Sequence, residues 1–393
     1  MIKKNLPTVA VLMTIAVFFA VLIIVISQKD ITYTMYNVET ISYEKGVVRA
    51  ILAERTEPAN GMTGWSLGIQ EISVEITNGI YKGQLIKIDN MLSTDHNVRV
   101  KAGQAVIIKA DRPQGIDPYY TIYNYDRAQG VIIIAALFAL LMAVVGKAKG
   151  VRSVLGLGVS LALILGFMLP AIYKGYSPVL TAAVTVAGVA AFSLILLNGL
   201  NRKTVVSLGA VIICAGLAAA CYGLITSILN LTGYNVDGME ELIMISRNTG
   251  LKLGQVLFVS VLISSLGAIM DVSISISSSM FEITRVNSGI SAKKLLASGI
   301  EVGRDLMGAN CQTLILAFVG SSLATLLVLI SYGTMFDQFL SSDYMAVEIL
   351  HGIAGSMAVI AAVPITAAMC AFLSEKGSPP VIRQKVSSNV KNR

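Results

Sequence analysis

Charged residues are scarce in this chain of 393 residues. They make up 13% of it, whereas a soluble globular domain carries about 25%. Hydrophobic residues account for 55%. This composition excludes a soluble enzyme of this size, a disordered chain and a collagen-like chain. It predicts an integral membrane protein.

Catalytic motifs and clusters of metal ligands are also absent from the sequence. The chain has two histidines and four cysteines, and all four cysteines fall inside apolar runs without disulfide or metal-ligand spacing. It contains no His-Glu-x-x-His motif, no P-loop and no Gly-x-Gly-Asp motif of an intramembrane aspartyl protease. We therefore expect no enzymatic activity, no cofactor and no bound metal.

The net charge of +7 does not indicate a nucleic-acid-binding protein. Because no basic tract with interleaved aromatic residues occurs, we expect no nucleic acid among the partners. In a membrane protein, Lys and Arg gather in the cytoplasmic loops and orient the helices. The surplus of positive charge fits that role.

Eight apolar runs each approach the roughly 20 residues that a membrane-spanning helix needs. They cover residues 6–27, 129–146, 153–172, 178–198, 205–230, 254–280, 307–332 and 348–373. We interpret the first as an uncleaved helix within residues 1–27, because no small-residue cleavage site follows it. The other seven predict a helical membrane domain over residues 128–373.

Basic residues mark alternate breaks between these runs. Lys and Arg concentrate after residues 146, 198 and 280 and in the C-terminal tail, residues 374–393. The breaks in between are poorer in them. Eight helices with both termini in the cytoplasm place every basic break on the inside. The partner that this topology implies is the lipid bilayer.

Residues 28–127 follow a different pattern. Short bursts of alternating apolar and polar residues are separated by Gly, Asn, Asp and Pro. They occur at residues 47–51, 72–76, 85–88, 98–108 and 119–123. A period of two with such breaks is typical of strands. Five or six strands in about 100 residues predict a small OB-like or SH3-like barrel.

The predicted fold class is therefore a polytopic α-helical membrane protein. It has about eight transmembrane helices, and the small β-barrel-like domain lies between the first and the second of them. The topology places this domain outside the cytoplasm.

Asp271 is the one acidic residue in the middle of an apolar run. Charged groups at that depth are costly and mark candidate functional sites. At helical spacing Asp271 shares a face with five polar or small residues. They are Ser264, Gly267, Ser275, Ser278 and Glu282. Such a stripe cannot face lipid, so we expect it to line a protein interface or a water-filled path.

Two roles are open for the Asp271 carboxyl. It can take up and release a proton as its access to water changes, which is how a coupled transporter uses such a group. Alternatively, it stays protonated and only hydrogen-bonds a neighbouring helix.

A second polar cluster opens the run at residues 307–332. Glu301 and Asp305 lie one helical turn apart and flank Arg304, which can pair with either of them. Together with Glu282 they form a candidate cytoplasmic gate, and an interfacial ion pair that only begins a helix is the alternative. Three deeper polar residues need partners in the bundle: Asn310, Gln312 and Thr313. The serines and the carboxyl of the mid-span stripe are candidate partners.

Residues 290–303, between these two runs, predict an amphipathic cytoplasmic segment. Ser291 is the expected N-cap, and Leu295 lies on the apolar face. At the outer end of the bundle, Glu348 and His351 lie one turn apart and form a candidate protonatable pair. An interfacial anchor is the alternative role for that pair.

Two stretches resemble the YibE/F family of bacterial multi-pass membrane proteins. They are Gly267-Ala-Ile-Met-Asp271-Val-Ser-Ile-Ser-Ile276 and Gly303-Arg304-Asp305-Leu-Met-Gly308. The preceding β region is similar as well. The resemblance implies a location in the bacterial cell membrane, and it implies no particular biochemical activity.

The order of Gly, acidic and Ser residues from Gly267 to Thr313 is also similar to the motor-helix region of SecDF and RND-type transporters. There, too, an acidic residue lies on an inward-running helix that an amphipathic segment and an outward-running helix follow. This chain differs in having an extra helix pair, a smaller outer domain and one such unit instead of two. The resemblance implies that a second copy, or a related membrane chain, supplies the other half.

Two functions follow as hypotheses. The first is a secondary transporter or a proton- or cation-coupled export factor, in which Asp271 responds to the ion and the neighbouring polar residues line its path. The second is a non-transporting membrane scaffold or assembly factor. In that case the outer β domain binds a partner protein, and the polar stripe holds helices together.

Overall fold

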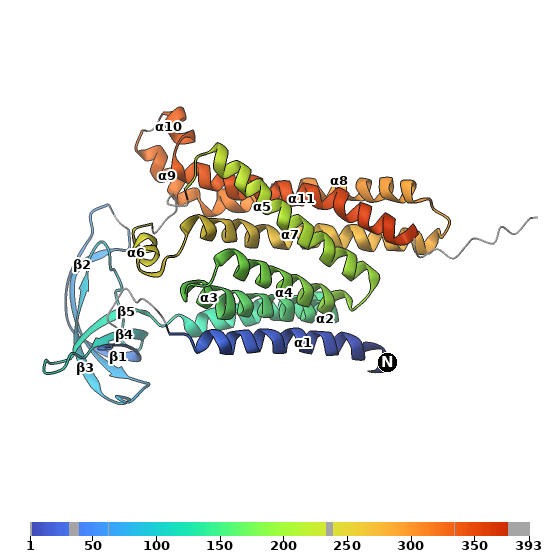
Figure 1. Cartoon of the computed structure of the whole chain (residues 1–393). Coiled ribbons are helices and arrows are strands. Elements are labelled where there is room, and N and C mark those ends of the chain that lie inside the picture. The colour runs from blue at the N-terminus through green and yellow to red at the C-terminus, as the bar shows by residue number, and fades with distance from the viewer. Residues whose placement is uncertain (1, 31–38, 62, 233–238, 334, 376–393) are drawn as a thin grey trace, which may run out of the picture. The chain divides into compact units, whose positions relative to one another are not determined.

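The computed structural model describes residues 2–30, 39–61, 63–232, 239–333 and 335–375. Contacts between residues divide the chain into two units, whose elements Figure 1 labels. One unit consists of residues 1–33 and 145–393 and is called the helical unit below; the other consists of residues 34–144 and is called the β unit. Residues 376–393, most of the predicted basic tail, lie outside the described part.

Five antiparallel strands form the sheet of the β unit. They are β1 Ile41–Pro58, β2 Ser66–Ile76, β3 Leu85–Leu92, β4 Ala105–Asp111 and β5 Tyr119–Tyr125. Their order is β3-β2-β1-β4-β5, so β3 and β5 are the edges. β1 is 18 residues long and pairs with both β2 and β4. Two register shifts, between Val48 and Ala50 and between Ile51 and Ala53, bend it into a half-barrel.

Alternation of side chains explains the core of the β unit. β3 alternates exposed and buried residues along its whole length. The inward-facing side chains form one apolar core: Val48, Ile72, Val74, Ile86, Ile88, Val106, Ile108 and Ile122. The predicted strands are thus confirmed as five, but β1 is much longer than expected. Residues 98–100 alternate like a strand in the sequence and are not one in the structure.

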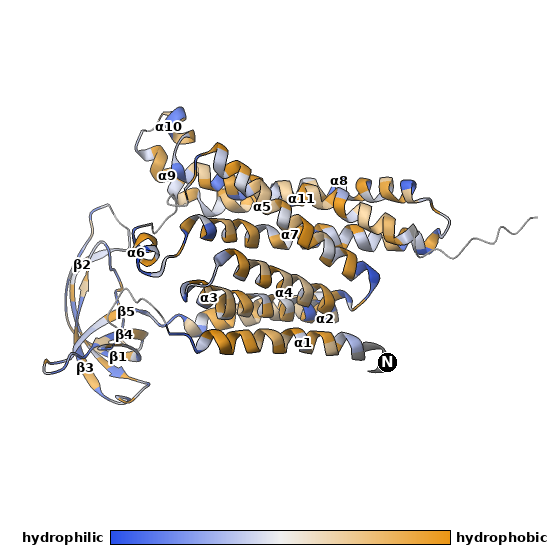
Figure 2. Ribbon diagram, in the orientation of Figure 1, coloured by the Kyte–Doolittle hydropathy of each residue, from blue (hydrophilic) through white to orange (hydrophobic). Residues whose placement is uncertain are grey.

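The remaining described elements are helices, most of them apolar along their length (Figure 2). They are α1 Ile2–Ser27, α2 Ala128–Leu163, the π-helix η1 Ile164–Met168, α3 Leu169–Tyr173, α4 Pro178–Asn198, α5 Arg202–Ile228, α6 Met239–Thr249, α7 Leu253–Val286, α8 Ala292–Ser321, α9 Leu323–Ser331, α10 Phe336–Leu340 and α11 Asp343–Glu375. Side-chain caps begin three of them, one being α11, where Ser342 accepts a hydrogen bond from the Met345 N–H. Asn201 accepts a hydrogen bond from the Thr204 N–H, and Ser291 accepts one from the Lys294 N–H, as predicted.

Among the described residues, six helical stretches are long and apolar enough to cross a membrane. There are up to seven if α8 and α9, which meet at a bend of 55°, count as one span. The longest stretch, Ala128–Tyr173, has 46 residues, about twice the length that a bilayer needs. Its backbone is non-helical at Lys147 (φ 49°, ψ −134°), the break expected between the spans at 129–146 and 153–172. The helical membrane architecture agrees with the prediction, and the count of eight spans stays a prediction.

α7 packs against α4, α5, α8 and α11 within the helical unit. α8 approaches it closely at two glycines: a Cβ at Gly299 would lie 2.3 Å from Met280 Sδ, and one at Gly303 would lie 3.0 Å from Ile276 Cδ1. Together with the buried Leu295, these glycines form one stripe along α8. The expected Ser291 cap and the apolar face at Leu295 are confirmed, but residues 290–303 do not form a segment of their own. From residue 292 onward they are the first part of a 30-residue helix.

Candidate functional site

α7 has two polar faces, and one of them is covered by its neighbours. On the covered face, Ser273 and Ser277 are fully buried. Ser277 Oγ lies 2.7 Å from Ser207 Oγ of α5, and Thr366 of α11 donates to Ser273 Oγ at 3.3 Å. These hydroxyls link three helices within an apolar core. Periodicity does not reveal them, because serines occur on both faces of this segment.

The other face of α7 carries the predicted stripe and is largely uncovered. Asp271 and Gly267 are exposed, and Ser264, Ser275 and Ser278 are half-buried. A Cβ added at Gly267 would meet no atom within 4 Å. Asp271 has no hydrogen bond or ion pair with any residue that the structure describes. The mid-span carboxyl therefore lies on a surface that the described chain leaves open.

The predicted gate residues lie exposed on α7 and α8. Arg304 pairs with Glu301 at 2.8 Å, while Asp305 is exposed and has no ion pair within the described ranges. Glu282, near the end of α7, pairs with Arg285. Both pairs join residues three apart on one helix, so neither of them links α7 to α8.

The deeper polar residues of α8 bond to their own helix. The side chains of Asn310 and Thr313 donate to carbonyl oxygens four residues earlier, at 3.0 and 2.9 Å, and Gln312 is exposed. None of them hydrogen-bonds to Asp271 in the described part of the chain. A carbonyl one turn back satisfies a short polar side chain without help from a neighbouring helix, which explains why the expected inter-helix bonds are not formed.

The predicted outer pair, Glu348 and His351, does not bond to itself. His351 Nε2 lies 2.7 Å from Ser260 Oγ of α7, and its ring stacks on Phe318 of α8 with the centroids 5.5 Å apart. Glu348 Oε2 is buried and has no hydrogen-bond partner among the described residues. His351 thus ties three helices together, and Glu348 keeps a buried oxygen unpaired.

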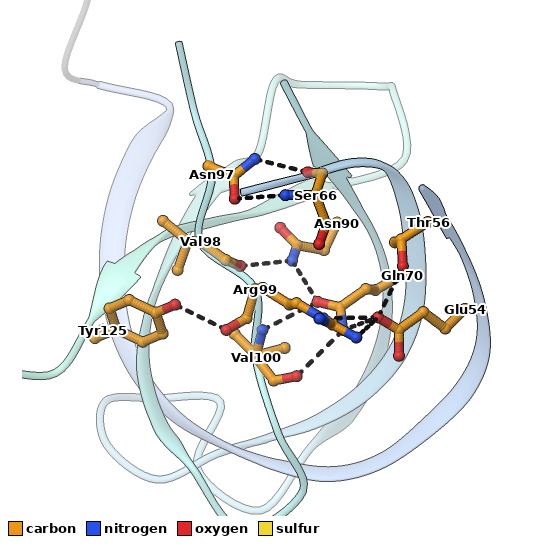
Figure 3. A network of polar contacts seen from close by, with 10 residues as sticks. All are labelled: Glu54, Thr56, Ser66, Gln70, Asn90, Asn97, Val98, Arg99, Val100 and Tyr125. Atoms are coloured by element: carbon orange, nitrogen blue, oxygen red, sulfur yellow. Dashed lines mark hydrogen bonds and ion pairs between the residues drawn. The ribbon is translucent and has the colours of Figure 1, made fainter. Parts of the chain in front are cut away.

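The β unit contains a second polar network (Figure 3). Gln70 of β2 and Asn90 of β3 are almost fully buried. Asn90 Nδ2 donates to Gln70 Oε1 at 3.2 Å and to the Val98 carbonyl at 2.8 Å. The Val100 N–H donates to Gln70 Oε1 at 3.0 Å, and Gln70 Nε2 returns a bond to the Val100 carbonyl at 3.2 Å. Two side-chain amides therefore hold residues 98–100 where a strand would use backbone bonds.

Further contacts fix the same segment. Arg99 pairs with Glu54 of β1 at 2.9 Å, and the Tyr125 hydroxyl donates to the Arg99 carbonyl at 2.7 Å. Asn97 Nδ2 donates to the Ser66 carbonyl at 2.7 Å. The sequence pattern did not predict this network. Its one signal in the sequence is the presence of two amide residues at inward positions of strands that otherwise bury Ile and Val.

The chemistry open to these groups is limited. No group of three or more His, Cys, Asp or Glu side chains that could hold a metal ion occurs in the described ranges. A lone carboxyl on an uncovered helix face can exchange a proton, but it does not make a nucleophile–base pair.

Comparison with known proteins identifies a family. The family model described as YibE/F-like protein matches residues 134–376. That range includes Asp271, the gate residues and the outer pair, and it leaves out the five strands. No curated protein and no solved structure matches the chain. The similarity to SecDF and RND-type transporters stays a prediction.

Proposed function

The chain belongs to the YibE/F-like family, as its sequence predicted, and we propose that this membrane-embedded protein is a secondary transporter or a proton- or cation-coupled export factor. Asp271 is its ion-responsive group. The other polar residues of the α7 stripe, Ser264, Ser275 and Ser278, line the ion path beside it, and Asn310, Gln312 and Thr313 of α8 extend that path.

The observation that carries the proposal is the exposure of Asp271 near the middle of α7, an apolar helix of 34 residues. A charged side chain at the centre of a bilayer costs about 3 kcal/mol or more. An uncovered carboxyl at that depth is therefore protonated, reached by water, or covered by another chain. A group that passes between the first two states as its access changes can couple ion movement to a conformational change.

A second copy of this chain, or a related membrane chain, covers the open face of α7 in this proposal. Lipid tails offer no hydrogen bonds to Asp271 or to the serines one turn away. Gly267 lies on the same face with open space beside its Cα, so a helix of the partner can approach closely there. A homodimer is the simplest form of this arrangement.

The exposed groups near the end of α7 and in the first half of α8 form the proposed cytoplasmic gate. The ion pairs Glu282–Arg285 and Glu301–Arg304 are both solvent-exposed, and exposed ion pairs contribute little to stability. Rearranging them, with Asp305 beside them, therefore costs little. At the other end of these helices, the unpaired oxygen of Glu348 and the neighbouring His351 make up the proposed outer protonatable pair.

The proposed orientation places both termini in the cytoplasm of a bacterial cell and the β unit outside it. The basic residues between the spans support this orientation. We assign the β unit to the OB-like barrels. Its strand order, with the long bent β1 in the middle and β3 and β5 at the edges, matches a five-stranded barrel opened along one seam.

Proton flux in proteoliposomes tests the proposal. The full-length chain and Asp271→Asn are reconstituted at equal density, and an imposed proton gradient is followed with an internal pH-sensitive dye. We expect flux with the wild type and a loss of about tenfold or more, equivalent to 1.4 kcal/mol of barrier, with Asp271→Asn. Asp343→Asn, at the exposed start of α11, is the control and keeps the flux. Equal flux in the wild type and in Asp271→Asn would refute the assignment.

A membrane scaffold whose outer β unit binds a partner protein is the second candidate function. Large side chains exposed on the sheet favour it, since soluble domains rarely leave such groups together: Met91, Tyr119 and Tyr123. Deleting residues 30–125 separates the two functions. Loss of partner-protein binding on deletion, together with the same proton flux in Asp271→Asn as in the wild type, supports the scaffold. Loss of proton flux in Asp271→Asn supports the transporter.

A further inference from the structure

A groove opens in the β unit between the two edge strands. Its volume is about 380 Å³, and its walls include Asp89 and Asn90 of β3, His96 of the following loop, and Tyr119 and Tyr123 of β5. This size suits a small organic ligand, since such sites commonly enclose about 300–1,000 Å³. The groove belongs entirely to residues 34–144, so an inference about it is independent of Asp271.

Two tyrosines form one wall of the groove. Tyr119 and Tyr123 are four residues apart on β5, about 13 Å along the strand, and both line the groove. Their exposed fractions are 68% and 53%. Tyr123 is held in place by an edge-to-face contact with Tyr43, with ring centroids 5.0 Å apart. The wall thus presents two separated aromatic side chains to a ligand longer than a single ring.

The opposite wall carries hydrogen-bond acceptors. Asp89 is exposed, and His96 is half-buried. Asn90 uses its amide nitrogen to donate to Gln70 and to Val98, so its amide oxygen is the group that it can offer to a ligand. A carboxylate, an amide oxygen and an imidazole together suit a ligand with several hydroxyl groups. The single negative charge disfavours an acidic ligand.

The polar network holds this wall in place before any ligand arrives. Asn90 is only 3% exposed and is fixed by the amide bonds described above. The His96 N–H donates to Ser93 Oγ at 3.0 Å, and the Ser93 N–H donates to the His96 carbonyl at 2.9 Å. Asn97 Nδ2 donates to the Ser93 carbonyl at 3.1 Å. Groups that are already ordered lose less entropy on binding, so the site is preorganised.

We propose that this groove binds a neutral or amino-substituted oligosaccharide of two or three sugar units. The sugar rings stack on Tyr119 and Tyr123, which lie about 13 Å apart along β5, too far apart for one sugar ring to stack on both. The hydroxyl groups donate to Asp89 and Asn90 and bond with His96. An extended peptide that pairs with the free edge of β3 is the competing occupant, but such pairing uses the backbone and requires neither the two rings nor the acceptors.

Isothermal titration calorimetry on the full-length chain in lipid nanodiscs tests the proposal. The probes are chitotriose, cellotriose and maltotriose, with trigalacturonic acid as the acidic counterpart. We expect at least one of the first three trisaccharides to bind and the acidic trisaccharide not to bind. Tyr119→Ala and Tyr123→Ala each weaken binding by about tenfold, or 1.4 kcal/mol. Tyr119→Phe keeps the ring and the affinity, and Ile80→Ala, at a residue that is 96% exposed, is the matched control.

Three results would overturn the proposal. The first is the absence of binding by chitotriose, cellotriose and maltotriose. The second is an affinity that Tyr119→Ala leaves unchanged in a variant whose thermal unfolding matches the wild type. The third is binding of the peptide (Thr-Val)5 in place of the trisaccharides, which would make the groove a strand-pairing site.

Discussion

The β unit and the helical unit differ in whether their most conspicuous polar side chains are buried and hydrogen-bonded. Gln70 and Asn90 are buried between strands, and both are hydrogen-bonded within the chain. Asp271 lies on an apolar helix, is exposed, and has no partner among the described residues. A polar group whose partners belong to its own chain stabilises the fold. For a polar group without them, in a helix that can cross a membrane, we propose a partner of another kind: water, an ion or a second chain.

The glycines of the helical unit repeat this contrast. A Cβ at Gly303 would lie 2.3 Å from Val363 Cγ1, whereas one at Gly267 would meet nothing within 4 Å. The first glycine is required by packing inside the chain. The second lies on the face that Asp271 shares, and its open space is available to a partner helix.

The largest effect on stability is expected from Gly303→Val. The new side chain would overlap Val363 and Ile276, and we expect a loss of about 3 kcal/mol in the free energy of unfolding. Thermal unfolding of the full-length chain in detergent measures it. The matched variant Gly267→Val should change this free energy by less than about 0.5 kcal/mol. A similar loss in both variants of the monomeric chain would mean that the Asp271 face is covered by the chain itself; a loss with Gly267→Val in the dimer alone would point to the second copy.

Gln70→Leu is expected to have the next largest effect. It leaves Asn90 Nδ2 and the Val100 N–H without their shared acceptor, and a buried unsatisfied donor costs about 1–3 kcal/mol. Amide hydrogen exchange of β2 and β3 in the full-length chain should therefore accelerate. Gln84→Leu, at an exposed position just before β3, is the control and should leave the exchange unchanged. Equal exchange in the wild type and in Gln70→Leu would mean that the network does not stabilise the β unit.

The smallest effect is expected from the pH-dependent contribution of Asp126, which precedes α2, to the stability of the β unit. A hydrogen bond from the Ala128 N–H at 3.1 Å, and then Lys45 at 3.1 Å, hold the pKa of this carboxyl below its usual 3.8. Because the folded-state pKa is the lower one, the carboxylate stabilises the β unit above pH 3.8, and this contribution is lost as the pH falls through the lowered value. We expect less than about 1 kcal/mol.

Amide hydrogen exchange of β5 is measured in the wild type and in Asp126→Asn as the pH is lowered. The greater protection of the wild-type amides at neutral pH should disappear as the solution is acidified. A difference in protection that stays constant from neutral to acidic pH would contradict the stabilising role of this carboxylate.

The sequence predicted the parts of the fold in which periodicity and burial agree. β3 alternates without a break, and the Asp271 stripe falls on one side of α7 as helical spacing requires. The prediction failed where a few specific contacts override the pattern. Residues 98–100 alternate like a strand, but the amides of Gln70 and Asn90 hold them in place.

The polar partners in the helical unit were harder to predict. Asn310 and Thr313 were expected to reach a neighbouring helix, but carbonyls of their own helix satisfy them. The buried serines that link α5, α7 and α11 occur in the same segment as the exposed ones, so the pattern alone does not distinguish them. Which of two polar faces is covered depends on long-range packing, which the sequence does not encode locally.

The most direct test of the account is the reaction of Asp271 with a membrane-permeant carbodiimide, which modifies protonated carboxyl groups in apolar surroundings. The full-length chain is labelled in liposomes, and mass spectrometry reports which carboxyl groups are modified. We expect modification of Asp271 that changes when the pH on one side of the membrane is changed, while the ion-paired Glu301 stays unmodified. An Asp271 that is unreactive, or that reacts to the same extent whatever pH gradient is imposed, would contradict its role as the proton-responsive group.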